Sequence, residues 1–272
     1  MKNKPLVSVV VPAWNAENFL EEAVNSVTAQ TYKNIEIIII NDKSSDATGD
    51  LAEELAKKDR RIKVIHNNKN LGIGSNRKKG VSEAKGKYIC WQDADDISFP
   101  DRIESQVKTL EADEKIGVIG GWLVFFDEKG DGAIRKYSKN DIDLRRNVFK
   151  YNPVAQPASM FRKEVFDVVG QYNDKLRVSE DLEMFLRVGE KYNFANIQKP
   201  AIKYRQLKNS LTSSKLRQME KETLKLRKKY KKSSAYDWTL SDSLYNFAQK
   251  ITIYIPTSLR MKLFGFIRGD KK

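Results

Sequence analysis

The first hundred residues alternate between short apolar runs and amphipathic segments, and this alternation restricts the fold more than any other feature. Runs rich in β-branched residues predict four buried strands, at 6–14, 35–42, 62–67 and 88–92. Apolar residues at helical spacing predict helices between them, at 17–30, 44–59 and 76–86. Asn15 is a candidate cap for the first helix. Strands connected in this way form parallel βαβ units, and strands apolar on both faces need helices on each side. The sequence therefore predicts an α/β fold with a mostly parallel central sheet.

The pattern becomes mixed after residue 100. We expect helices at 100–113 and 180–192, and strands at 116–126, 158–162 and 196–205. From about residue 207 the chain becomes strongly basic and then rich in large apolar residues, with Pro256 expected to separate two helices. We therefore expect one domain over 1–212, with halves at about 1–98 and 99–212, and a helical C-terminal extension over 213–272.

Composition leaves little material for several kinds of catalytic site. The chain has one histidine, His66, and one cysteine, Cys90, so Ser-His-Asp, Cys-His and Cys/His zinc sites are disfavoured. His66 is expected to be structural or solvated. A bound metal would need carboxylate oxygens, which suits Mn²⁺ or Mg²⁺. No apolar run reaches the roughly 18 residues of a membrane span, and the first residues do not resemble a signal sequence. We therefore expect a cytoplasmic protein.

The chain is strongly basic, with a net charge of +14. Such a charge favours anionic partners: nucleic acid, an anionic membrane surface or phosphorylated small molecules.

Three aspartates within four positions follow the fourth predicted strand: Asp93, Asp95 and Asp96. Carboxylates packed so closely repel one another, so either water screens them or a cation lies among them. We favour a metal or ligand role for this cluster.

Other polar residues are expected at the same edge of the sheet, because ligands of open α/β sheets bind beyond the carboxyl ends of the strands. Trp14 and Asp42 follow the first two strands, and Arg77 follows the third. Asp42 alone is also typical of a turn, and Arg77 alone of a solvated helix. Together with the acidic cluster, however, these residues suit a nucleoside diphosphate held through a divalent cation.

Several segments, in order, resemble the inverting glycosyltransferases of family 2, which have the GT-A fold. The matching segments are VSVVVPAWNAENFLEEAVNSVTAQTY, IEIIIINDKSSDAT, NLGIGSNRKKG, YICWQDADDISFPDRIESQV, QPASMFRKEVFDVVGQY and SEDLEMFLR. They extend from about residue 6 to about residue 212. The DADDIS version of the DxD motif is most similar to bacterial enzymes that build surface polysaccharides. The resemblance implies a nucleotide-sugar-binding half at about 1–98 and an acceptor-binding half at about 99–212.

The resemblance also implies donor-site residues: Pro12, Ala13, Asn15, Glu17, Asp42, Arg77, Asp93 and Asp95. Asp42 would contact the uracil or ribose of a UDP-sugar, and Arg77 would lie near the diphosphate. Asp95 would ligate Mn²⁺ or Mg²⁺, while Asp93 would hold sugar or ribose hydroxyls, with metal ligation as its alternative role. Asn76 and Lys78 depart from the family's usual residues beside this arginine.

In the second half, the resemblance implies that Asp181 is the catalytic base. A single displacement needs a base for the acceptor hydroxyl, and the start of a helix favours an ionised carboxylate. Gln156 and Glu180 are candidate acceptor contacts, although Gln156 replaces a common His and Glu180 also suits a first-turn helix charge. Leu207 likewise replaces a common His. The implied acceptor is a hydroxyl of a glycan or of a lipid-linked glycan.

The basic extension allows two interpretations. The lysine run at 221–232 suits a solvated helix face, whereas the apolar and cationic residues of 238–272 suit contact with an anionic membrane at its inner face. The alternative is that 238–272 packs on the domain or on a second subunit, as in an oligomer.

Two other functions remain open from the residues alone. A nucleotidyltransferase would normally carry a glycine-rich loop and a lysine after the first strand, where this chain has PAWNAEN. A nucleic-acid-binding protein would agree with the charge. However, the sequence contains no nucleic-acid-binding motif, and we do not expect the protein to bind nucleic acid.

Overall fold

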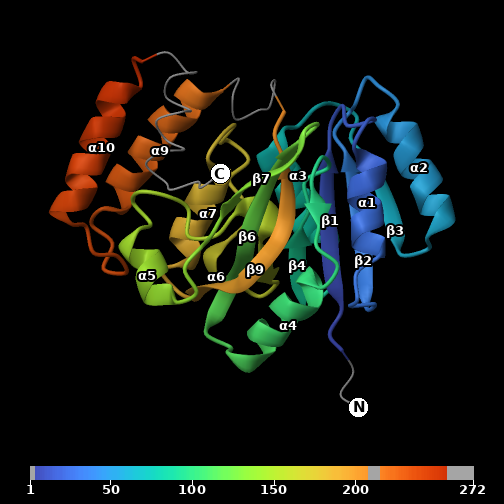
Figure 1. Cartoon of the computed structure of the whole chain (residues 1–272), viewed down its shortest axis with the longest axis horizontal. Helices are drawn as coiled ribbons and strands as arrows, with labels where there is room; N and C mark the ends of the chain where they lie inside the picture. The colour runs from blue at the N-terminus through green and yellow to red at the C-terminus, as the bar shows by residue number, and fades with distance from the viewer. Residues whose placement is uncertain (1–3, 208–214, 256–272) are drawn as a thin grey trace.

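The computed structural model describes residues 4–207 and 215–255 and contains one curved mixed sheet between layers of helices (Figure 1). The strand order is β3-β2-β1-β4-β8-β6-β9-β5, and β7 pairs with β6 outside this path. The α/β fold with a flanked central sheet is thus confirmed.

The first half of the sheet is parallel, as the alternation predicts. Its strands are β1 (Val7–Ala13), β2 (Ile35–Asn41), β3 (Ile62–His66) and β4 (Tyr88–Trp91), and each neighbouring pair is parallel. The connecting helices are α1 (Leu20–Thr28), α2 (Thr48–Lys58) and α3 (Ile73–Glu83). Asn15 does not cap α1, because that helix begins five residues later and has no side-chain cap; the prediction of this cap is wrong.

The second half is mixed, with both parallel and antiparallel pairs. Its strands are β5 (Ile97–Ser98), β6 (Ile116–Asp127), β7 (Gly130–Arg135), β8 (Met160–Arg162) and β9 (Asn193–Arg205). Its helices are α4 (Arg102–Ala112), α5 (Asp141–Arg146), the 3-10 turn η1 (Gln156–Ala158), α6 (Val165–Val169) and α7 (Glu180–Val188). Only β6 and β9 run parallel here; the pairs of β4 with β8, β8 with β6, β6 with β7, and β5 with β9 are antiparallel.

Burial of both sheet faces explains the unbroken apolar runs. Along β1, Val9 and Val11 belong to one core cluster, whereas Val10 belongs to the cluster on the other face. Ile39 and Ile40 of β2 divide in the same way. Because successive side chains point to opposite faces, a strand covered by helices on both sides must be apolar throughout.

Two helices of the C-terminal extension lie at one end of the molecule (Figure 1). They are α9 (Leu216–Tyr230) and α10 (Leu240–Thr252), and α9 contacts both α7 and α10. The predicted break at Pro256 lies outside the described residues. Within the described ranges, no helix is long and apolar enough to cross a membrane.

A buried arginine connects the aspartate turn to the core. Arg102, at the start of α4, is fully buried and donates hydrogen bonds to the carbonyl oxygen of Trp91 at 2.8 Å and to Ser98 Oγ at 2.9 Å. It also donates to Gln92 Oε1 at 3.3 Å. Burial lowers the pKa of the guanidinium despite the nearby Asp96 and Asp93 charges. Arg102 therefore connects Trp91 and Gln92, just before the aspartate turn, to Ser98, just after it.

We predict that Arg102→Met destabilises the protein by about 3–5 kcal/mol, because it leaves several buried acceptors without a donor. Urea unfolding followed by circular dichroism would measure the loss. Lys108→Met, an exposed cation on the same helix, is the matched control and should change the free energy of unfolding by less than about 0.5 kcal/mol. Equal effects of the two changes would contradict this account.

Candidate functional site

The aspartate cluster forms a tight turn beyond the carboxyl end of β4. The side-chain amide of Gln92 donates to the carbonyl oxygens of Asp93 at 3.1 Å and Asp96 at 2.8 Å, and the Asp96 N–H donates to the Asp93 carbonyl at 3.2 Å. These bonds fix the backbone, so that the direction of each carboxyl group is set by the turn.

The three aspartates have different surroundings. Asp96 is 1% exposed, and its Oδ1 accepts from the Arg205 N–H at 2.9 Å. Arg205 also donates through Nε to the carbonyl oxygen of Asp95 at 2.8 Å. Asp93 and Asp95 are half-buried, and in the described part of the chain neither carboxyl group is hydrogen-bonded to another side chain. Asp96 thus supports the turn, while the carboxyl oxygens of Asp93 and Asp95 have no side-chain hydrogen bond within the described residues.

Burial makes these carboxyl groups hard to ionise. It raises the pKa of Asp95 to about 6, with the neighbouring Asp93 charge adding to the effect. Burial likewise raises the pKa of Asp93, against the attraction of Arg77 and Arg102 and with the repulsion of Asp181. A divalent cation would reverse this balance, because it favours the ionised form of both groups.

Arg77 is buried and paired rather than solvated. Its Nη1 donates to Glu180 Oε1, and its guanidinium lies 5.8 Å from the ring centres of both Trp91 and Tyr172. Burial opposes the charge, but Glu180 together with Tyr172, Asp93 and Asp181 outweighs it, and the pKa of Arg77 is raised. This ion pair joins α3 of the first half to α7 of the second, and its charge also acts on Asp93.

Asp181 lies at the start of α7, in the first helical turn. Its Oδ1 accepts from the Leu182 N–H at 2.8 Å, and its Oδ2 accepts from Asn152 Nδ2 at 2.7 Å. Ser179, just before the helix, has a positive φ of 59°, which turns the chain sharply into α7. The carboxylate is therefore held in one orientation by two donors.

Gln156 and Glu180 are both buried, so neither presents a freely accessible side chain. Gln156 Nε2 donates to the Tyr172 hydroxyl at 3.2 Å, and its Oε1 is buried without a hydrogen-bond partner. Burial raises the pKa of Tyr172, so this hydroxyl stays protonated. The unpaired Oε1 of Gln156 could still accept a hydrogen bond.

Asp42 organises the loop between β3 and α3. Its Oδ1 accepts from Asn67 Nδ2 and from the Leu71 N–H, both at 2.8 Å, and its Oδ2 accepts from the Gly72 N–H at 2.9 Å. Gly72 has a φ of 82°, a backbone conformation that would be strained in a residue with a side chain. Only the second oxygen of Asp42 has room for one further donor.

Asn15 and Glu17 connect the loops after β1 and β2. Asn15 Oδ1 accepts from the Ser45 N–H at 2.9 Å, and Glu17 Oε2 accepts from the Ala47 N–H at 2.8 Å. Pro12 and Ala13 end β1 beside them, and Ala13 is buried. These four residues form one wall at the carboxyl edge, with their polar atoms used to fix loops.

Sequence reasoning missed several residues that shape the site. Asn152 holds Asp181 from an irregular loop, and Arg205 holds the aspartate turn from the end of β9. Trp91 is a core residue, and the Arg77 guanidinium lies 5.8 Å from its ring centre. A run YR at the end of the last predicted strand was the one available signal for Arg205. No pattern marked Asn152.

The donor set suits a hard divalent cation bound together with a phosphorylated ligand. Asp93 and Asp95 offer carboxylate oxygens, and no cluster of three or more metal-binding side chains occurs within residues 4–207 and 215–255. Mg²⁺ and Mn²⁺ are commonly held by one or two carboxylates, with phosphate oxygens and water completing the shell. The residues present therefore fit the expected metal.

Residues 8–170, more than half of the chain, match the family described as "Glycosyl transferase family 2". The chain belongs to glycosyltransferase family 2. It is 37% identical over 235 residues to an uncharacterized glycosyltransferase of Haemophilus influenzae, which covers 83% of this chain and 72% of the relative. It is 32% identical over 210 residues to the putative glycosyltransferase EpsE of Bacillus subtilis, covering 76% and 75%.

Solved structures agree with the fold at low sequence identity. S. aureus TarS 1-349 in complex with UDP-GlcNAc superposes with a TM-score of 0.68 and 16% identity, covering 96% of this glycosyltransferase and 78% of TarS. The mannosyltransferase PcManGT of Pyrobaculum calidifontis, in complex with GDP-Man and Mn²⁺, gives 0.67 and 15%, covering 94% and 72%. The expected GT-A fold, with helices in a C-terminal extension, is confirmed.

We predict that Asp95→Asn stabilises the metal-free glycosyltransferase at pH 7.5. Because the folded-state pKa of about 6 exceeds the ordinary 3.8, protonation favours folding, and the ionised group costs up to about 3 kcal/mol above pH 6. The gain should shrink as the pH falls below 6, because the folded-state carboxyl group becomes protonated, and it disappears only below 3.8, where the group is protonated in both states. Urea unfolding in a chelator at pH 7.5 and 4.5 would measure it. Asp167→Asn, an exposed aspartate, should show no such gain.

Proposed function

We propose that this family 2 glycosyltransferase moves a hexosyl or N-acetylhexosaminyl group from a UDP-sugar to a hydroxyl of a glycan or lipid-linked acceptor, with inversion, in surface polysaccharide synthesis. The observation that carries the proposal is the convergence of Asp93, Asp95, Arg77 and Asp181 at one edge of the sheet. Electrostatic coupling joins Asp93 to both Arg77 and Asp181.

The donor half of the proposal rests on the carboxyl ends of β1 to β4. Pro12, Ala13 and Asp42 would face the nucleoside, and Trp14 beside them is 56% exposed and available for stacking. Asn15 and Glu17 would act by holding the wall in place. The solved relatives support the nucleotide part, since TarS is seen with UDP and UDP-GlcNAc, and PcManGT with GDP-Man.

Asp93 and Asp95 would hold Mn²⁺ or Mg²⁺. When bound, the ion would stabilise the negative charge that develops on the leaving nucleoside diphosphate. Asp95 is the better ligand because Arg205 Nε fixes its backbone carbonyl, while its carboxyl oxygens, like those of Asp93, have no side-chain hydrogen bond within the described residues. Asp93 interacts electrostatically with Arg77 and Asp181, and it would also position sugar or ribose hydroxyls.

Asp181 would act as the base. Its carboxylate takes the proton of the acceptor hydroxyl while that oxygen bonds to the anomeric carbon. The bond from this carbon to the diphosphate oxygen breaks at the same time, and its electron pair leaves with the diphosphate. Asn152 keeps one oxygen of Asp181 oriented, and Arg77 keeps the adjacent Glu180 paired.

We predict that Asp181→Asn lowers sugar transfer at least 10³-fold and leaves UDP affinity within about twofold, because the amide cannot accept the proton. Its oxygen can still accept from the Leu182 N–H, so the helix start is preserved. Product formation from a panel of UDP-sugars and calorimetric UDP binding would measure the two effects. Asp167→Asn is the control of equal charge change. Turnover by Asp181→Asn at the wild-type rate would remove this residue from the mechanism.

We also predict that Asp95→Ala removes the dependence of UDP binding on Mn²⁺. Isothermal titration of UDP with and without Mn²⁺ should give a large affinity difference for the native protein and none for the variant. Asp96→Ala is the contrasting change: it should mainly destabilise the turn, since this residue is buried and bound to Arg205. Undiminished metal dependence in Asp95→Ala would place the ion elsewhere.

The proposal includes the division of the chain. Residues 1–98 would bind the donor, 99–212 the acceptor, and the extension 213–272 would bring the enzyme to the inner face of an anionic membrane through 238–272. A lipid-linked acceptor would give that location its purpose.

A further inference from the structure

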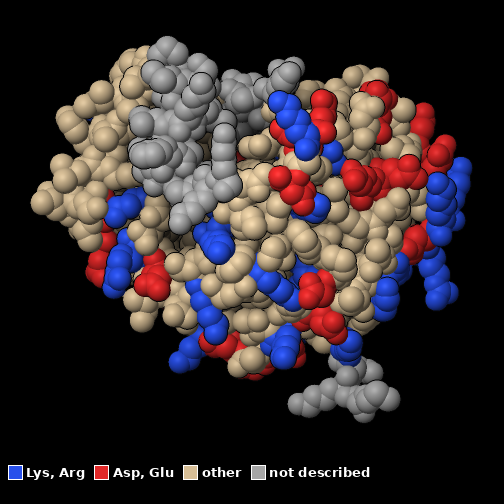
Figure 2. All heavy atoms as spheres, viewed as in Figure 1, with Lys and Arg blue, Asp and Glu red and all other residues tan. Residues whose placement is uncertain are grey.

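Helix α10 exposes four large apolar residues and buries two polar ones, Asp242 and Gln249, which departs from the usual pattern of a surface helix. Leu240, Leu244, Phe247 and Ile251 are 55% to 77% exposed and, at 100° per residue, lie within an arc of about 60°. Tyr254 continues this line just past the helix end and is also exposed. We call these five residues the apolar stripe. The surface over α10, at the left of Figure 2, shows few charged side chains beside it.

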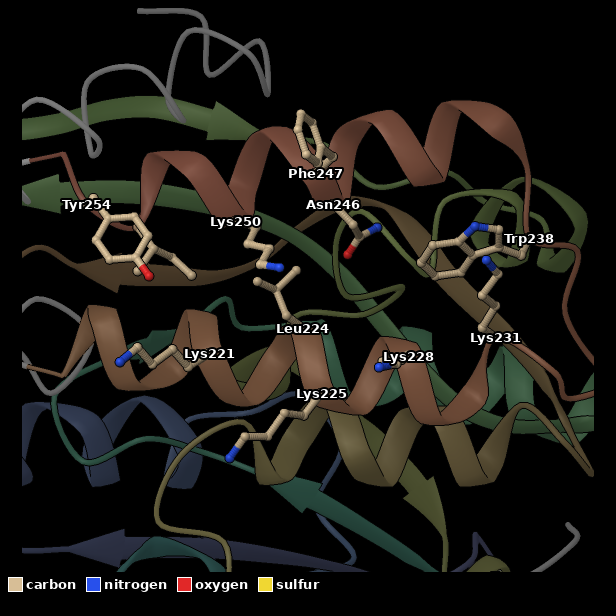
Figure 3. A pocket seen from close by; sticks show the side chains of 11 residues that line it. Lys221, Leu224, Lys225, Lys228, Lys231, Trp238, Asn246, Phe247, Lys250 and Tyr254 are labelled. Carbon is tan, nitrogen blue, oxygen red and sulfur yellow. The ribbon is translucent and has the colours of Figure 1, made fainter.

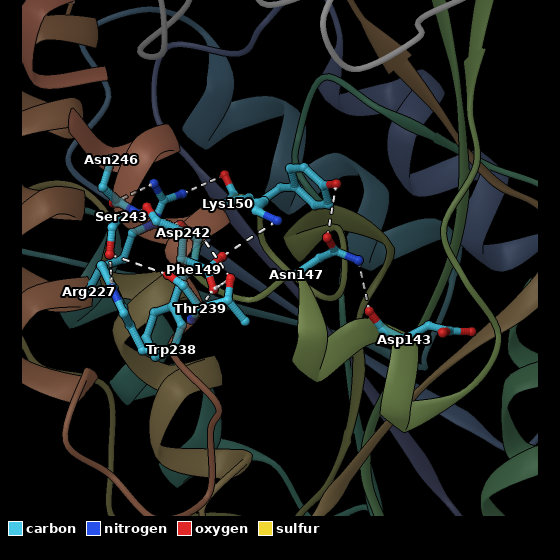
Figure 4. Close-up of polar contacts among 11 residues, drawn as sticks. Asp143, Asn147, Phe149, Lys150, Arg227, Trp238, Thr239, Asp242, Ser243 and Asn246 are labelled. Atoms are coloured by element: carbon cyan, nitrogen blue, oxygen red, sulfur yellow. Dashed lines mark hydrogen bonds and ion pairs between the residues drawn. The ribbon is translucent and has the colours of Figure 1, made fainter. Parts of the chain in front are cut away.

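The opposite face of α10 is anchored by polar contacts. Asp242 is fully buried; it closes a capping box with Thr239 and forms an ion pair with Lys150 at 3.6 Å. Asn246 Nδ2 donates to the carbonyl oxygen of Phe149 at 3.0 Å (Figure 4). Gln249 Oε1, near the other end of the helix, accepts from Arg227 of α9 at 2.8 Å.

These contacts fix the rotation of the helix. Turning α10 to bury the apolar stripe would leave Asp242, Asn246 and Gln249 without their partners, and an unpaired buried polar group is costly. The apolar stripe is therefore a stable feature of the fold and needs a partner outside it.

A basic groove lies alongside the apolar stripe, between α9 and α10 (Figure 3). It encloses about 570 Å³, and its apolar lining includes Leu224, Trp238 and Ile253. Five lysines also line it, and no acidic residue does: Lys221, Lys225, Lys228, Lys231 and Lys250. Apolar and cationic side chains thus occupy one continuous surface.

Charge decides which partner suits this surface. Residues 215–255 contain ten Lys or Arg against four Asp or Glu, and two of these acids, Glu220 and Asp242, are buried. A symmetric dimer through the apolar stripe would bring the lysines of two copies together without acidic partners. An anionic lipid surface suits both sets of residues. Its acyl chains can contact the apolar stripe, and the layer of phosphates above them can contact the lysines.

We propose that the apolar stripe of α10 and the lysines of the adjacent groove form a docking surface for an anionic phospholipid bilayer. The apolar stripe enters the boundary between headgroups and acyl chains, and the lysines contact the phosphates. The proposal deepens the peripheral contact proposed above and does not depend on the transfer reaction.

Vesicle flotation of the full chain tests the proposal, with vesicles of phosphatidylcholine alone or with phosphatidylglycerol. The native protein should float with the anionic vesicles and lose this binding at high salt. The triple change Leu244→Gln, Phe247→Gln and Ile251→Gln should reduce binding at least tenfold. The pair Ser241→Gln and Ala248→Gln, exposed on the same helix outside the apolar stripe, should bind as the native protein does.

A charge series separates the lysines from net charge. Lys221→Gln, Lys225→Gln and Lys228→Gln together should reduce anionic-vesicle binding at least tenfold, whereas Lys57→Gln, Lys108→Gln and Lys129→Gln, exposed lysines elsewhere, should not. UDP binding should stay unchanged in every variant, which keeps this test independent of the proposed transfer reaction.

Three results would overturn the proposal. Native flotation by the Gln variant of the apolar stripe would do so. So would unchanged flotation of that variant together with loss on deletion of 256–272, which would assign the contact to the terminal segment. A native dimer that the same variant converts to a monomer, measured by light scattering without vesicles, would assign the apolar stripe to a second copy.

Discussion

Negative charge gathered at one edge of the sheet is the constraint on which the rest of the structure depends. Asp93, Asp95 and Asp96 follow β4, and Glu180 and Asp181 begin α7. Burial raises the pKa values of Asp93, Asp95 and Asp96, and the neighbouring carboxylates raise them further. Arginine side chains, rather than separation of the carboxylates, offset this repulsion. Arg77 pairs with Glu180, Arg205 bonds to the turn, and Arg102 holds it from below. Among the described residues, the carboxyl groups of Asp93 and Asp95 accept no hydrogen bond from an arginine or another side chain, and these are the groups that a divalent cation would complete.

The same arginines hold the two halves of the domain together. Arg77 comes from α3 and Glu180 from α7, so the pair joins the parallel half to the mixed half. Arg205 ends β9 and yet contacts Glu22 of α1 as well as the aspartate turn, packing its guanidinium near Phe19 and Phe126. The Arg77–Glu180 pair is buried on both sides, and such a pair is weak evidence for stability, because desolvation offsets the attraction. Its positioning role is clearer: the donor half and the helix that carries Asp181 are held in one relative orientation.

Local patterns predicted most of the sheet but little of what positions the site. The strands β1 to β4 followed from apolar runs, because burial on both faces leaves a signal in every residue. The two-residue β5 and the polar β7 carry no such signal and were not predicted. Asn15 is a residue type that commonly caps helices, but tertiary contacts to Ser44 and Ser45 determine its conformation instead. The placement of Asp93, Asp95 and Asp181 near one another required the resemblance, since they lie almost ninety residues apart. The partners of Asp181 and of the turn, Asn152 and Arg205, depend on three-dimensional contacts that no spacing encodes.

The extension connects this site to the outer surface of α10. Ser179, which turns the chain into α7, bonds through its Oγ to the Met219 carbonyl and to Thr223 Oγ1, both at 3.2 Å on α9. Arg227 of the same α9 helix bonds to Gln249 of α10. Met219, Thr223 and Arg227 lie on one face of α9, so this helix links the start of α7 to the inward, polar face of α10. If α10 docks on a bilayer as proposed, these contacts would hold Asp181 at a constant height above the lipid. The buried polar residues of α10 would contribute by preventing the helix from turning its apolar stripe inward.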